Sequence, residues 1–183
     1  GDLANMVANG TLTLTDATLT GNGSYALSNI ERFSLTGGGG ADNFNASGYS
    51  QSVTLSGLDG NDTLVGGSGS DCILGGNNDD SLSGGPGANT IDGGGGNDRW
   101  LESGDFNITL IPLGLLGEQD DSVTNVEFAS ITGGPGDNTF NLGGFTGVAT
   151  VDGGGGNDLL SGGNSSDSLL GNTGNDTLVG NAA

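Results

Sequence analysis

The sequence predicts an all-β protein in which short parallel strands stack as the successive coils of a solenoid. Three observations lead to this prediction. A six-residue motif, Gly-Gly-x-Gly-x-Asp, recurs at spacings of nine residues, with its clearest copies at residues 66–71, 93–98 and 153–158. An apolar residue stands two places after each motif, and a shift of 96 residues superposes the two halves of the chain. Repeats this short can bury one apolar residue each only by stacking on their neighbours.

The composition excludes an ordinary globular core. Glycine accounts for 41 of 183 residues and aromatic residues for only 5%, so apolar burial must be narrow and repetitive. The formal net charge is −20, with Arg32 and Arg99 as the only cationic side chains. Such a surface repels nucleic acid and anionic lipid headgroups and attracts cations. We therefore expect no nucleic-acid partner, and no apolar stretch is long enough to predict membrane insertion.

The internal repeat divides the chain into two units. The 96-residue shift places Phe44 on Phe140 and Asp62 on Asp158. We expect a first solenoid unit at residues 1–101 and a second at residues 102–183, stacked as one continuous rod. Each unit begins with motif-free strands, at residues 1–36 and 102–132, where apolar and polar residues alternate with the period of a β-strand. The glycine-rich repeats follow at residues 37–101 and 133–183.

The apolar residue after each loop predicts one inward side chain per short strand. These residues are Phe44, Leu64, Ile73, Leu82, Ile91, Trp100, Phe140, Leu160, Leu169 and Leu178. Two loops and two strands make one coil of 18 or 20 residues. The 40 residues from Gly93 to Gly133 then correspond to two coils, which predicts that the loops at Gly57, Gly75, Gly93, Gly153 and Gly171 share one edge. The loops at Gly66, Gly84 and Gly162 are expected on the other edge.

The motif has the chemistry of a site for a hard cation. Glycines at its first, second and fourth positions allow positive φ, so that backbone carbonyls can turn inward. One loop offers too few oxygens, but two loops one coil apart can supply the six or more that Ca²⁺ prefers. Carboxylates stacked about 5 Å apart repel one another until a divalent cation lies between them. We expect such a ladder at Asp42, Asp62, Asp80 and Asp98, resumed at Asp158 and Asp176, with Asp71 and Asp167 more isolated.

These loops resemble the nonapeptide repeat of RTX proteins. The resemblance covers about two-thirds of the chain and implies a right-handed parallel β-roll that binds several Ca²⁺ ions. From the loop chemistry we expect about three to seven ions. The residues that it implies as metal-binding are Asp42, Gly60, Asp62, Gly69, Asp71, Asp80, Gly96, Asp98, Gly156, Asp158, Asp167, Gly174 and Asp176.

Some positions depart from the repeat. The sixth position is Asn89 in one loop and Asn138 in another, which removes a charge and should weaken those two sites. Glu31 and Glu127 occupy equivalent places just before a strand in the two units, and there we favour a structural role over an ion ligand.

The function predicted from these patterns is a non-catalytic calcium-binding structural module. The resemblance implies that it folds on binding calcium outside the cell and belongs to a large secreted or cell-surface protein. The chain has no histidine and no lysine, so neither can activate a nucleophile, and we expect no enzyme activity in this segment. Two alternatives stay open: a calcium-dependent adhesive or glycan-binding module, and the C-terminal repeat region of a secreted enzyme. End-to-end self-association and contact with a cell surface are further expectations.

Overall fold

The computed structural model of the protein describes residues 3–21, 23–26, 30–104, 106–110 and 121–181. These residues form twenty strands and no helix, and none of them belongs to a helix that could cross a membrane. One sheet has six strands, in spatial order β1 (Leu3–Val7), β5 (Arg32–Thr36), β7 (Val53–Asp59), β9 (Cys72–Asn77), β11 (Thr90–Gly95) and β14 (Ser122–Thr124). A four-stranded sheet contains β13 (Ile108–Thr109), β16 (Thr139–Asn141), β18 (Leu159–Ser161) and β20 (Thr177–Val179).

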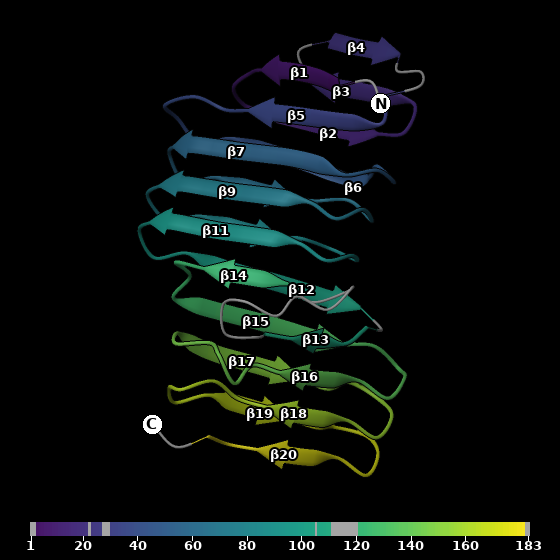
Figure 1. Ribbon diagram of the computed structural model, residues 1–183, viewed down its shortest axis with the longest axis vertical. Helices are drawn as coiled ribbons and strands as arrows, with labels where there is room; N and C mark the ends of the chain where they lie inside the picture. The colour runs from purple at the N-terminus through teal and green to yellow at the C-terminus, as the bar shows by residue number, and fades with distance from the viewer. Residues whose placement is uncertain (1–2, 22, 27–29, 105, 111–120, 182–183) are drawn as a thin grey trace.

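The third sheet runs through both sequence units. Its ten strands are, in spatial order, β19 (Ser168–Leu170), β17 (Val148–Asp152), β15 (Phe128–Gly133), β12 (Arg99–Gly104), β10 (Ser81–Ser83), β8 (Thr63–Val65), β6 (Asn43–Gly48), β2 (Thr11–Thr15), β3 (Thr18–Gly21) and β4 (Gly23–Ala26). From β4 to β12 and from β14 to β20, the chain alternates between this sheet and one of the other two. Those two sheets follow one another along the long axis (Figure 1). The all-β parallel solenoid predicted from the sequence is confirmed.

The core consists of the apolar side chains that point inward from the two faces of the solenoid. Leu55, Ile73 and Ile91 lie in register on one face, and Leu64, Leu82 and Trp100 on the other. All six are fully buried, and each such aliphatic side chain contributes about 1.5–3 kcal/mol. The inward prediction also holds for Phe44, Phe140 and Leu160. Leu178 lies in register with Leu160 on the same stripe, but it is 47% exposed because no described coil packs over the last strand.

The first strands of the ten-stranded sheet depart from the parallel prediction. β2, β3 and β4 form an antiparallel meander, whereas every other strand pair is parallel. The turn between β2 and β3 is held by the Thr15 hydroxyl, which accepts the Thr18 backbone N–H at 3.0 Å. The meander extends the sheet beyond the first coil and buries Leu12, Leu14 and Leu19.

The two units are half a turn out of phase, so the predicted sharing of edges is wrong. Loop 93–98 leaves the six-stranded sheet, whereas loop 133–138 leaves the ten-stranded sheet. The reason is one long coil: Trp100 pairs with Ala129, 29 residues later, where the neighbouring coils advance by 18 and 20. The interval that we expected to hold two coils therefore holds one and a half. Loops 153–158 and 171–176 share the edge of loops 66–71 and 84–89, and loop 162–167 shares the edge of loop 93–98.

Candidate metal centre

The sixth-position carboxylates form a ladder that joins successive coils. The Asp62 carboxylate accepts the backbone N–H of Asp42, Asp80 accepts that of Asp62, and Asp98 accepts that of Asp80, each through Oδ1 at 2.8 Å. The second unit repeats the pattern, because Asp158 Oδ1 accepts the Asn138 N–H at 2.8 Å. One oxygen of each carboxylate is thereby committed to holding the coils in register.

The second oxygen of four of these carboxylates is buried without a partner. Within the described part of the chain, no hydrogen-bond donor reaches Oδ2 of Asp62, Asp80, Asp98 or Asp158. Burial raises the pKa of Asp62 and Asp98 above the usual range and that of Asp80 to about 6. A buried charged oxygen with no compensation is strongly unfavourable, so each of these four positions calls for a cation.

The asparagine loop shows which other atoms converge there. Asn89 takes the sixth position of loop 84–89, and its Nδ2 donates to the carbonyl oxygens of Gly85 at 2.8 Å and Gly87 at 3.3 Å. The second and fourth carbonyls of a loop thus point at the tip of the sixth side chain. Where that residue is aspartate, three oxygens meet and the side chain supplies no N–H to bridge them. A hard cation such as Ca²⁺ fits this oxygen-only set.

The next coil contributes a further oxygen to the same point. A Cβ added to Gly57 would collide with Asp62 Oδ2 and would lie 2.6 Å from the Gly75 carbonyl oxygen. Gly75 has the same pair of neighbours one coil later, Asp80 Oδ2 and the Gly93 carbonyl. The first position of these loops must be glycine because a side chain would fill the space between a carboxylate and the carbonyl that faces it.

Seven of the eight loops with a sixth-position aspartate fall into two conformational classes, and loop 171–176 belongs to neither. In the four loops with an unpartnered Oδ2, the second residue has positive φ: Leu58 at 79°, Gly76 at 123°, Gly94 at 98° and Gly154 at 88°. In the other class the second residue does not have positive φ, and its N–H donates to Oδ2 of its own loop. These contacts join Gly38 to Asp42 at 2.9 Å, Gly67 to Asp71 at 2.6 Å and Gly163 to Asp167 at 2.7 Å. Loops of the second class satisfy their own carboxylate.

The predicted fourth-position glycines have a steric role. Gly60, Gly96, Gly156 and Gly174 all have positive φ, and a Cβ on any of them would collide with the backbone of the preceding or following coil. Asn78, which replaces glycine at this position, adopts a φ of 79°, as expected for a residue that tolerates left-handed geometry.

The sites are built mainly from backbone. In the ranges that the structure describes, no group of three or more His, Cys, Asp or Glu side chains is placed to hold a metal ion. This agrees with one sixth-position carboxylate per site, since the remaining ligands would be carbonyl oxygens of two coils.

Sequence reasoning missed two buried acids beside loop 84–89. The Glu102 carboxylate is 5% exposed and accepts the N–H groups of Gly84 at 2.6 Å and Gly85 at 3.2 Å, as well as Trp100 Nε1–H at 3.1 Å. Asp121 Oδ1 accepts the Asn89 N–H at 2.8 Å. The signal for Glu102 was in the strand alternation, because a residue two places after the inward Trp100 also points inward.

Glu102 predicts a pH dependence of stability. Burial, reinforced by the charge of Asp121, raises the pKa of Glu102 from 4.5 to about 7. The stability contributed by the protonated form is complete below pH 4.5 and is lost as the pH rises through 7. Glu102→Gln carries no charge at any pH, so at pH 8 and saturating calcium the variant should be about 1–3 kcal/mol more stable than the wild type. Urea unfolding at pH 5 and pH 8 measures this; identical pH dependence in both proteins would contradict it.

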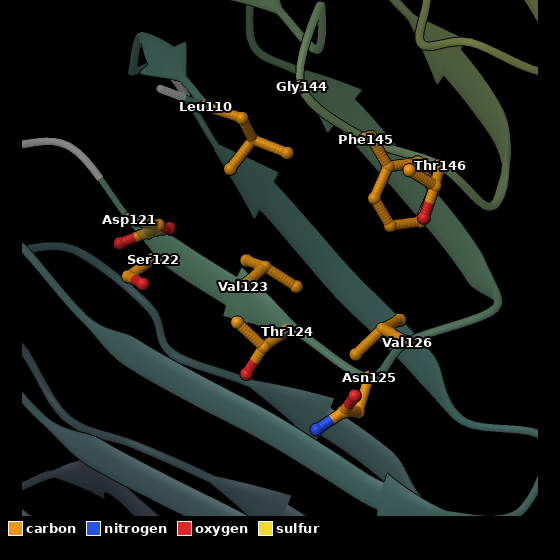
Figure 2. A pocket seen from close by; sticks show the side chains of 10 residues that line it. All are labelled: Leu110, Asp121, Ser122, Val123, Thr124, Asn125, Val126, Gly144, Phe145 and Thr146. Atoms are coloured by element: carbon orange, nitrogen blue, oxygen red, sulfur yellow. The ribbon is translucent and has the colours of Figure 1, made fainter. Parts of the chain in front are cut away.

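A groove lies within the second unit, between β14 and residues 144–146. Figure 2 shows Leu110, Val123, Val126 and Phe145 lining it, with Asp121 at one end. Its volume is about 290 Å³. It lies where the six-stranded and four-stranded sheets do not pair with each other, and it contains no loop aspartate.

The fold and its loops define a class: parallel β-solenoids whose turns form oxygen-only cages for a hard cation. Residues 54–82, 74–99 and 144–178 match the family model described as RTX calcium-binding nonapeptide repeat (4 copies). These segments of the chain therefore carry RTX calcium-binding nonapeptide repeats, as the sequence predicted. No significant match to a curated protein was found.

Proposed function

We propose that this chain is a structural module that folds when Ca²⁺ binds between its coils. The observation that carries the proposal is the set of four buried carboxylate oxygens without a hydrogen-bond partner among the described residues. A protein with no bound cation would have to bury four uncompensated charges, which is more than its narrow core can offset.

We assign one ion to each of the loops 57–62, 75–80, 93–98 and 153–158. Four ions lie within the range expected from the sequence, but only some of the predicted metal-binding residues are assigned to them. Three other carboxylates already have N–H donors. Both oxygens of Asp71 and of Asp167 accept an N–H, and so does Oδ2 of Asp42, the oxygen that would face the ion. We therefore assign these three aspartates to structural loops. Asp176 supports the site at Asp158, whose backbone N–H it accepts at 3.0 Å.

The free energy of calcium binding is large enough to account for the folding of the chain. Calcium at ten times its dissociation constant contributes about 1.4 kcal/mol per site, so four sites contribute about 6 kcal/mol. The whole stability of a domain is about 5–15 kcal/mol. Because calcium-binding modules outside cells work at millimolar calcium, we place the chain in a secreted or surface-attached protein and consider the module itself non-catalytic.

Two aspartate-to-asparagine variants test the assignment of ions. Asp80→Asn should lose one calcium ion, because the new amide can donate to the carbonyls of Gly76 and Asn78 as Asn89 does in its own loop. Asp71→Asn should keep the wild-type number of ions and lose about 1–2 kcal/mol of stability, because the Gly67 N–H loses its acceptor. Isothermal titration with calcium counts the ions. Loss of an ion in both variants, or in neither, would refute the division into two loop classes.

A further inference from the structure

The ladder of Asp62, Asp80 and Asp98 ends on a segment that carries no repeat motif. This segment, residues 125–127, connects β14 to β15 and lies outside every stretch that matches the repeat family. Strand pairing fixes its place, because Asp92 is opposite Thr124 and Arg99 is opposite Phe128. Residues 125–127 therefore cover loop 93–98 with half as many residues.

The first and last residues of this short loop occupy the places of motif residues. Glu127 Oε2 accepts the Asp98 N–H at 2.8 Å, the same bond that Asp98 Oδ1 makes with the Asp80 N–H. The additional methylene of glutamate compensates for the missing residues. A Cβ on Gly93 would collide with the Asn125 carbonyl oxygen and lie 2.6 Å from Asp98 Oδ2, so Asn125 presents its carbonyl where a motif loop presents its first one.

Asp98 is the part of this arrangement that requires a ligand. Its side chain is completely buried, and no described residue donates to its Oδ2. That oxygen lies across Gly93 from the Asn125 carbonyl. A second carboxylate, that of Glu127, is close enough to accept the backbone N–H of Asp98. Carboxylate and carbonyl oxygens that gather in a buried space repel one another unless a cation lies between them.

We infer that Asn125 and Glu127 complete a Ca²⁺ site with Asp98, so that the ladder is closed by ligands outside the nonapeptide repeats. This inference rests on the proposed function and extends it to residues that no motif identifies. It also reverses the sequence-based preference for a purely structural Glu127. Glu31, its counterpart in the first unit, is exposed and serves as the matched control.

The test is calcium titration by calorimetry on five proteins: the wild type, Glu127→Gln, Glu31→Gln, Asp98→Asn and the double variant Asp98→Asn/Glu127→Gln. Glutamine keeps an oxygen that can accept the Asp98 N–H, so circular dichroism at saturating calcium should show an intact fold. Glu127→Gln should lose one site or weaken one site at least about tenfold, equivalent to 1.4 kcal/mol. Glu31→Gln should bind as the wild type does.

The double variant keeps the inference falsifiable should Glu127→Gln fold poorly. Asp98→Asn can close its own loop by the amide contacts seen at Asn89, and it should lose one ion. Adding Glu127→Gln to it should remove no further ion, because both residues serve the same site. Unchanged calcium binding in Glu127→Gln, or loss of a second ion in the double variant, would overturn the inference. A wild-type protein that binds no calcium would instead refute the proposed function.

Discussion

Chelation of calcium is expected to abolish the β-sheet circular dichroism of this protein, and excess calcium to restore it. Without the ion, four carboxylates are buried beside carbonyl oxygens, in a chain whose formal net charge is −20. Burial already disfavours the charged form of Asp80, since it raises the pKa of this carboxyl to about 6. The repetitive core contributes too little to hold these charges together, so the expanded chain should be the stable state at low calcium.

Trp100 gives an independent measurement of the same transition. It is the only tryptophan, it is fully buried, and its emission should shift to longer wavelength when the coils separate. Magnesium is the matched control, because Mg²⁺ dehydrates reluctantly and requires near-ideal octahedral geometry; it should not restore the spectrum at equal concentration. A dichroism spectrum that is unchanged after exhaustive chelation would refute calcium-coupled folding.

Gly57→Ala should disable the first site of the ladder. The added methyl group would occupy the space between Asp62 Oδ2 and the Gly75 carbonyl oxygen. The Asp62 carboxylate is held in place because its Oδ1 accepts the Asp42 N–H. We expect the loss of one calcium ion and a destabilisation of about 2–4 kcal/mol, combining overpacking with loss of the ion. Calorimetric titration and urea unfolding at saturating calcium measure the two effects.

The control for this variant is Gly39→Ala. A Cβ at Gly39 meets nothing within 4 Å, and the residue is exposed. The substitution should change stability by less than about 0.5 kcal/mol and leave the number of ions unchanged. Equal effects of the two substitutions would mean that glycine at position 57 serves only backbone flexibility and encloses no cation site.

Much of the local structure could be predicted from the sequence because each repeat determines it separately. The residue two places after the loop faces inward whatever coil it belongs to, so Ile73 and Phe140 were placed correctly from spacing alone. Asn78 could be predicted to adopt left-handed geometry for the same local reason. The exposure of Leu178 could not be predicted in this way, because its burial depends on whether another coil covers it.

What the sequence by itself determined is the repeat: an all-β solenoid, its inward stripe and loops whose oxygens suit calcium. The tertiary structure decided which loops satisfy their own carboxylate, as at Asp71, and which leave an oxygen for an ion, as at Asp80. It also decided that the second unit is half a turn out of phase and that Glu127 stands over Asp98. The phase of the second unit and the position of Glu127 depend on contacts between residues 29 positions apart. Motif spacing alone does not specify these contacts, because the length of a connection does not say how many times the chain crosses between the sheets.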